Sequence, residues 1–170
     1  DIVHVYANYP EYNWVSAQES GPEGIACVDD AGRAAVVYLR DFELNHRKSS
    51  LDRARRLLQF VLAMQESDGQ FYNFIFEDHS INRDGKTSFK SFGWWAARGI
   101  WSLGHGYRVF KEIDTLFARR LGLAVERSLP HVHALIQKYG RTEQEDGFTF
   151  PLWLLYESAA DATSELLLGL

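Results

Sequence analysis

Two adjacent carboxylates, Asp29 and Asp30, are the residues best suited to do chemistry in this sequence. Hydrolysis of a glycosidic bond uses two carboxyl groups, one protonated and one ionised, and their separation sets the stereochemical outcome. Because adjacent residues seldom face one substrate together, we expect one of them to lie in a cleft and the other to cap a helix. The alternative is structural: both are acids in the first turn, where the helix dipole stabilises negative charge, and Arg33 pairs with Asp29 at i,i+4.

The setting of Asp30 predicts which part it would play. The positive end of a helix dipole and Arg33 at i,i+3 both hold its carboxylate ionised, so Asp30 is expected to be a base or an electrostatic stabiliser. The proton donor would then be Glu19, Glu23 or Asp161, or would lie in a further part of the ring. Asp161 distinguishes two functions: catalysis is favoured if it faces Asp30 across a cleft, and binding if it caps its own helix.

Trp94, Trp95 and Arg98 form a second group of candidates for substrate binding, together with Arg33, Glu19 and Glu23. Consecutive helical residues differ by about 100° around the axis, so we expect one tryptophan to form a sugar-stacking platform and the other to pack in the core. Arg98 repeats the position of Arg33 and either binds a carboxylated sugar or braces neighbouring helices. The two glutamates precede the first helix and either serve the site or are solvated loop acids.

Three helix starts rich in small residues would position these side chains. The segments DDAGRAA, WWAARGI and ADATSEL begin at positions 29, 94 and 160, which places them 65 and 66 residues apart. Longer amphipathic segments alternate with them. A helix with small residues on several faces is surrounded by other helices, whereas a helix with a charged face lies outside. The repeat therefore predicts an inner layer of small-residue helices within an outer layer of amphipathic ones.

The hydrophobic periodicity predicts five helices, over about Asp29–Asn45, Ser50–Gln65, Gly93–Phe110, Ile113–Tyr139 and Leu152–Leu170. Ser49 or Ser50 is expected to cap the second helix, and Pro130 to kink or split the fourth. The connection 66–89 carries Asp-Gly turn signals at Asp68 and Asp84, which favour a short β-hairpin. These elements fix the expected frame of the site.

The predicted fold class is all-α: a partial (α/α) toroid of about two and a half helical hairpins in a single domain, 1–170. Residues 1–24 form an irregular aromatic arm and residues 25–170 the hairpins. A closed ring of six hairpins needs far more residues, and the sequence is still apolar at Leu170. We therefore expect the N-terminal part of a longer toroid, which self-associates through its unfinished helical edge.

Composition excludes several other classes of function. A net charge of -5 without a basic stripe argues against a nucleic-acid partner, and no apolar stretch approaches the ~20 residues of a membrane span. Cys27 is the sole cysteine and is expected to be buried; the histidines lack ligand spacing, so we expect neither a metal nor another cofactor. Because the chain begins at Asp1, we expect a processed or cut chain, which leaves localisation open and favours a secreted or periplasmic protein.

The segments IACVDDAGRAA and WWAARGIWSLG resemble the signatures C-x-D-D-x-x-R-A and G-R-x-L-W-x-L-G of bacterial (α/α) six-hairpin glycosidase-like toroids. Some members of that family lie beside glycosyltransferase domains. Gly32 stands where the family pattern tends to have alanine, and Trp94-Trp95 where a polar residue is common. The resemblance implies a carbohydrate-active, glycosidase-like domain that processes or binds a glycan in a cleft at the inner helix starts. The alternative is a non-catalytic glycan-binding or scaffolding module attached to another catalytic domain.

Overall fold

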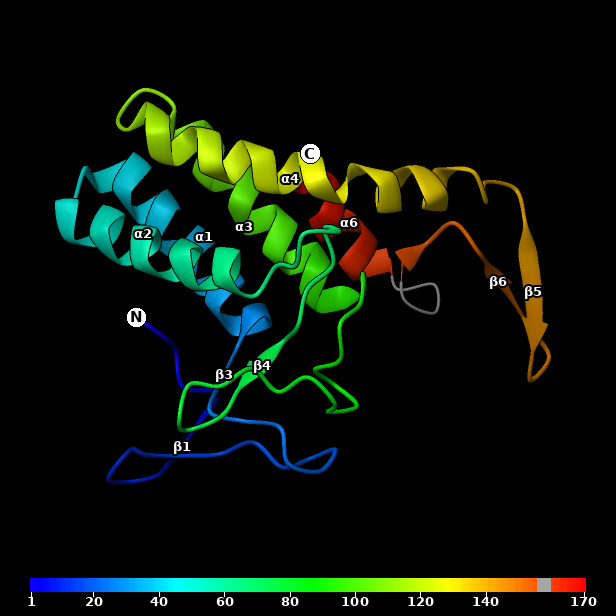
Figure 1. Cartoon of the computed structure of the whole chain (residues 1–170), viewed down its shortest axis with the longest axis horizontal. Helices are drawn as coiled ribbons and strands as arrows, with labels where there is room; N and C mark the ends of the chain where they lie inside the picture. Colours follow the sequence, from blue (N-terminus) through cyan, green and yellow to red (C-terminus); the bar gives the residue numbers. More distant parts are fainter. Residues whose placement is uncertain (156–159) are drawn as a thin grey trace.

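The described residues, 1–155 and 160–170 of a computed structural model, form five helices and three small two-stranded antiparallel sheets (Figure 1). The helices are α1 (Val28–Asn45), α2 (Lys48–Ala63), α3 (Trp94–Phe110), α4 (Thr115–Ile136) and α6 (Ala160–Leu168). The strands are β1 (Tyr6–Asn8), β2 (Asn13–Val15), β3 (Ala26–Cys27), β4 (Phe74–Ile75), β5 (Thr142–Glu145) and β6 (Phe148–Pro151). The fold is all-α, as predicted: a partial toroid of two helical hairpins, α1–α2 and α3–α4, followed by α6.

Helix α3 is the centre of the helical body. It packs against α1 and against α6, while α2 packs mainly against α1, and α4 against α3. Figure 1 shows α3 (green) in the middle, with α1 and α2 to one side and α6 (red) to the other. The alanines Ala97 and Ala162 are buried in these contacts, and Ala34 is partly buried. The packing is the one that the repeated small-residue starts predict, a row of α1, α3 and α6 with α2 and α4 added outside it.

Small residues are needed because the helix backbones approach closely. A Cβ atom at Gly32 of α1 would lie 2.8 Å from the Arg98 carbonyl oxygen of α3, and one at Gly104 would lie 1.9 Å from the Gly169 carbonyl oxygen. Contacts between a real Cβ and backbone at such distances force the helices apart. Gly32, the departure from the family pattern, is therefore explained by the close α1–α3 packing.

The outer helices differ from the sequence prediction in two details. Helix α2 begins at Lys48 after Arg47, without a side-chain cap, so the predicted capping by Ser49 or Ser50 is wrong. Ser50 instead donates to Asp41 of α1. Helix α4 runs unbroken through Pro130, so of the two predicted effects, a kink or a split, the split is wrong. Pro130 and Glu126 are both exposed, and water can solvate the Glu126 carbonyl that loses its amide partner.

The connection between α2 and α3 closes its predicted Asp68-Gly69 turn with a single antiparallel bridge, Gln65 to Phe71, and forms no more extended hairpin among the described residues. Its strand β4 pairs with β3 instead, with Ala26 opposite Ile75 and Cys27 opposite Phe74. Two buried amides explain the choice, because Asn73 and Asn82 bind backbone groups of the segments flanking β3. The hairpins among the described residues are β1–β2 and β5–β6, at the two extremes of the chain (Figure 1).

The remaining expectations about the fold concern its ends. Of the predicted helix 152–170, α6 covers Ala160–Leu168, and residues 156–159 lie outside the described part. The predicted start at Leu152 is wrong, because residues 152–154 form a turn after β6. No helix among the described residues has the length and apolarity needed to cross a lipid bilayer.

Candidate functional site

The start of α1 is capped by two residues other than its acids. Cys27 is the N-cap residue, and its Sγ accepts a hydrogen bond from the Asp30 amide at 3.4 Å. Asn73 Oδ1 accepts from the amides of Val28 (3.1 Å) and Asp29 (3.4 Å). The expected capping role for one of the two aspartates is therefore wrong: both lie in the first turn, and their carboxylates remain available for other contacts. Cys27 is buried, and burial raises the pKa of its thiol well above the ordinary range.

Asp29 lies between two arginines. Its Oδ2 atom is 2.5 Å from Nη1 of Arg98, and its Oδ1 atom is 2.9 Å from Nη2 of Arg33. The second contact is an ion pair without hydrogen-bond alignment, so buried Oδ1 accepts no hydrogen bond from described residues. The Asp29 side chain is only 14% exposed, and this burial raises its pKa although Arg98 and Arg33 act in the opposite direction.

Arg98 connects all three helices of the central row. From α3 it reaches Asp29 of α1 and, through Nε, the Glu165 carboxylate of α6 at 2.9 Å. Asp161, one turn before Glu165, approaches Nη2 of Arg98 at 4.0 Å. Burial disfavours the charge on Arg98, but the two carboxylates outweigh it and raise the pKa of the guanidinium. In this geometry Arg98 braces neighbouring helices, which is the second of its two predicted roles. Its contacts with acids at the starts of α1 and α6 also place it within the candidate site.

The remaining acids of α1 and α6 are more open to solvent. Asp30 pairs with Arg33 at 2.6 Å and its side chain is partly exposed, while the Asp161 side chain is 75% exposed. Asp161 lies in the first turn of α6 and leans toward Arg98. Asp29, Asp30, Arg33, Trp94, Arg98, Asp161 and Glu165 together form what we call the helix-start face. Sequence reasoning missed Glu165, although its i,i+4 spacing from Asp161 places both on one side of the helix.

The two tryptophans separate as the helical geometry predicts. Trp95 is 1% exposed and donates from Nε1 to the Phe71 carbonyl at 2.9 Å, which makes it a core residue. Trp94 is partly buried and touches Trp95 edge to face, with ring centroids 4.6 Å apart. Because Trp94 and Arg98 are four residues apart on α3, they lie on the same side of that helix. Trp94 is thus the tryptophan that borders the helix-start face.

A small aromatic pocket adjoins Trp94. It has a volume of about 280 Å³ and is lined by Lys86, Phe89, Ser91, Phe92, Gly93, Trp94 and Trp95. Its walls are fixed, since Phe89 meets Trp95 edge to face and Phe92 stacks on His131 of α4 with centroids 5.0 Å apart. The pocket gives the helix-start face a hollow with aromatic walls.

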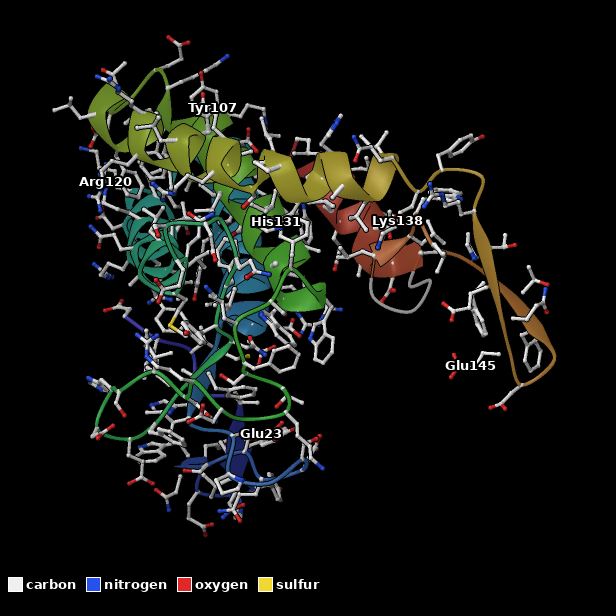
Figure 2. All side chains as sticks on the ribbon, turned by 45° about the vertical axis from the view of Figure 1, so that its right-hand side comes forward. Glu23, Tyr107, Arg120, His131, Lys138 and Glu145 are labelled. Atoms are coloured by element: carbon white, nitrogen blue, oxygen red, sulfur yellow. The ribbon has the colours of Figure 1, made fainter. Side chains whose placement is uncertain are left out.

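The two loop glutamates form hydrogen bonds with residues of the loops and of β1 and, among the described residues, none with the helix-start face. Glu23 is buried, accepts a hydrogen bond from the Thr87 hydroxyl and another from the Glu19 amide, and lies among the loops below the helices (Figure 2). Its own carbonyl accepts from the Asn82 side chain. Glu19 accepts from the Tyr6 hydroxyl at 2.8 Å. The solvated-loop alternative is therefore wrong for Glu23, which orders the loops through these bonds.

No family model and no curated protein sequence matches this chain. Among solved structures, the crystal structure of the GH family 9 endoglucanase J30 is similar over 86% of this chain and 33% of its own, at 15% identity and a TM-score of 0.48. A Bacteroides ovatus GH9 structure is similar over 99% of this chain and 38% of its own, at 20% identity and a TM-score of 0.45. The chain thus spans about a third of the length of these structures. Neither neighbour is a helical domain beside a glycosyltransferase, so that part of the sequence resemblance stays an expectation.

Proposed function

We propose that this chain is a carbohydrate-active segment that binds a glycan across the helix-start face. The single observation that carries the proposal is the junction at Arg98, where acids from α1 and α6 surround a cation that shares a side of α3 with Trp94. Sugar rings offer apolar C–H faces to aromatic rings and hydroxyl groups to charged side chains. The helix-start face provides both kinds of partner next to a hollow with aromatic walls.

Each residue has a distinct part in this proposal. Trp94 is the stacking platform. The partly exposed carboxylate of Asp30 and the exposed carboxylate of Asp161 accept hydrogen bonds from sugar hydroxyls. Arg98 and Arg33 hold Asp29 in place and fix the relative positions of the helices. Trp95 and Glu23 act indirectly: the first supports Trp94 from the core, and the second orders the loops.

Hydrolysis is the second candidate function, and one observation favours it. Burial raises the pKa of Asp29, which is the direction that a general acid requires, while Asp30 pairs with Arg33 as a base would. Against it, Arg98 lies 2.5 Å from Asp29, and a close cation favours the ionised carboxylate over the proton donor. Binding therefore ranks above catalysis.

Calorimetric titration with neutral hexasaccharides tests the binding proposal. The ligands are the β-1,4-linked glucose, mannose, xylose and N-acetylglucosamine hexamers and the α-1,4-linked glucose hexamer. Trp94→Ala should raise the dissociation constant for any bound hexamer by about tenfold, which is the effect expected from the loss of one stacking contact. Trp153→Ala is the matched control, because Trp153 is 36% exposed and its ring lies against Tyr139, beyond the end of α4. Equal affinities of the two variants would reject the helix-start face.

The catalytic alternative has a separate test in the release of reducing ends. Asp30→Asn and Asp161→Asn are compared with Asp52→Asn, which changes an exposed acid of α2. Hydrolysis by the chain predicts at least a hundredfold loss of turnover in one of the first two variants, well beyond its loss of glycan affinity. No release by the unaltered chain, together with measurable glycan binding, leaves the non-catalytic module as the function.

We also propose that the chain self-associates through the groove between α3, α4 and the end of α6. This groove, of about 1010 Å³, contains the exposed side chains of Tyr107, Leu116, Leu123 and Leu168. Exposed apolar surface of this kind favours association with a second copy. Sedimentation velocity should give a mass above 19.5 kDa at high concentration, and Leu116→Glu should restore the monomer. A monomer at every concentration would contradict the proposal.

A further inference from the structure

The hairpin formed by β1 and β2, Tyr6–Val15, presents four aromatic side chains to solvent. We call it the aromatic hairpin. Tyr6, Tyr9, Tyr12 and Trp14 are 41%, 81%, 70% and 45% exposed. Tyr9 and Tyr12 lie at its turn and touch edge to face, with ring centroids 6.0 Å apart. Tyr6 and Trp14 lie on the two strands and, by the β1–β2 register, project from opposite faces. Side chains of this size are normally covered by the fold, so the hairpin is unusual in exposing apolar rings at its turn and on both faces.

The patch is held in place from its base. The Val5 amide donates to the Ile25 carbonyl just before β3, and the Tyr6 hydroxyl donates to Glu19 at 2.8 Å. Trp14 stacks on His4, with centroids 4.9 Å apart and planes 10° from parallel. Tyr12 has a backbone φ of 56°, which a bulky residue adopts at a conformational cost that no burial of its ring offsets. The rings are thus presented by an anchored hairpin.

The charge around these rings selects the partner. Residues 1–24 contain neither lysine nor arginine, and two of their acids, Glu11 and Glu19, are exposed. Of their other two acids, Glu23 is buried and Asp1 pairs with Arg56. An anionic surface such as a nucleic acid, an acidic lipid or an acidic polysaccharide would be repelled. Asn8 and Asn13, which face each other in the β1–β2 register, add amide donors and acceptors beside the rings. Neutral ligands with alternating C–H faces and hydroxyl groups match this combination.

We propose that the aromatic hairpin is a second contact surface, for an uncharged polysaccharide chain. Flat aromatic rings pack on the C–H faces of pyranose units, while tyrosine hydroxyls, amides and carboxylates bind hydroxyl groups at the ring edges. The adjacent exposed rings of Tyr9 and Tyr12 can contact successive units of a repeating polymer, whereas the small pocket beside Trp94 fits a single sugar unit. This surface shares no residue with the helix-start face, and its function does not depend on that of the helix-start face.

The test is retention of the chain on insoluble neutral polysaccharides: microcrystalline cellulose, chitin, β-1,4-mannan and granular starch. The Tyr9→Ala/Tyr12→Ala double variant should bind the retained polysaccharide at least tenfold more weakly, while Tyr9→Phe/Tyr12→Phe should retain most of the affinity because the rings remain. Phe148→Ala is the matched control, an exposed aromatic residue, 67% exposed, on the other terminal hairpin β5–β6. Circular dichroism verifies that all variants fold.

Three results would overturn the proposal. The first is retention of the unaltered chain on none of these polysaccharides, and the second is equal retention of the double alanine variant. The third is capture of a proline-rich peptide by the same tyrosines without polysaccharide retention, which would identify a protein-binding surface. Trp94→Ala separates the two proposals, because it should weaken binding of the soluble hexasaccharide and leave retention on insoluble polysaccharide by the aromatic hairpin intact.

Discussion

Two polar clusters hold the start of α1, and they differ in charge and in exposure. The neutral cluster consists of Asn73, Asn82 and Ser88, all buried, which bind backbone groups of the loops and of α1. The ionic cluster consists of Asp29, Arg33, Arg98, Asp161 and Glu165, and several of its side chains are open to solvent. Each member of the neutral cluster has its hydrogen bonds within the protein.

The difference separates structural polarity from polarity that serves a ligand. A neutral group with all its partners inside the protein fixes one backbone arrangement and offers nothing to a ligand. Charged groups at a solvent border keep lone pairs and protons that a substrate hydroxyl can reach. The comparison predicts that substitutions in the neutral cluster mainly lower stability. Substitutions in the ionic cluster should lower stability less and glycan binding more, most clearly at its solvent-exposed residues.

The largest effect is expected for Asn73→Ala. The substitution removes the acceptor for the Asp29 amide and the donor to the Thr87 carbonyl, at 3.0 Å, from a buried site. Unpartnered buried groups should lower the free energy of unfolding by about 2–3 kcal/mol. Urea denaturation measures this loss, and Asn45→Ala, at an exposed asparagine of α1, should cost less than ~0.5 kcal/mol. Similar losses for the two variants would show that the neutral cluster stabilises the fold no more than an exposed asparagine does.

Arg98→Met is expected to have the next largest effect. It leaves the largely buried carboxylates of Asp29 and Glu165 without their shared cation, while water at the border of the cluster reduces the penalty. We expect a loss of about 1–2 kcal/mol in unfolding free energy. Arg108→Met, which breaks a more exposed pair with Glu43, is the control with an expected loss below ~0.5 kcal/mol. If Arg98→Met exceeded Asn73→Ala, the order of the two clusters would be reversed.

A smaller effect concerns the pH dependence of stability. Burial raises the pKa of Asp29 in the folded chain, so the native state binds this proton more readily than the unfolded state. The contribution of Asp29 to stability therefore falls as pH rises from about 3.9 through its raised pKa. Asp114 behaves oppositely: hydrogen bonds from the Phe117 amide and Arg55 lower its pKa, and its contribution is lost as pH falls. Asp29→Asn should thus make acid destabilisation steeper in urea titrations at pH 7, 5 and 4, and a shallower profile would contradict the raised pKa.

The smallest effect on stability is expected for Asp30→Asn. Because Cys27 and Asn73 cap the helix, Asp30 contributes only a solvent-exposed pair with Arg33 and a first-turn charge. Its replacement should change the unfolding free energy by less than ~0.5 kcal/mol. Any change in the free energy of glycan binding should be larger than this change in stability. A fall of several degrees in melting temperature with unchanged binding would place Asp30 with the structural residues.

Sequence reasoning predicted the helical frame because its signals are local. The spacing of small residues in DDAGRAA and WWAARGI reflects backbone contacts such as Gly32 against Arg98, and the 100° step separates Trp94 from Trp95. Contacts between segments far apart in the sequence could not be predicted in this way. Asn73 and Asn82 resemble ordinary turn residues in the sequence. Asn73 caps α1, and Asn82 binds the loop before β3, only when β4 pairs with β3. Glu165 was missed for the same reason, since only helix packing brings α6 to Arg98.

The pairing of β3 with β4 has a consequence for the order of folding. Cys27 and Phe74 are partners across the whole α1–α2 hairpin, and Glu23 meets Thr87 across a still longer stretch of chain. Closing such loops costs entropy that only many later contacts recover, whereas α1 and α2 meet through a two-residue connection. The α1–α2 hairpin should therefore form early, and the candidate site should assemble last. Native-state hydrogen exchange should find the amides around β3 and β4 opening before those in the middle of α3.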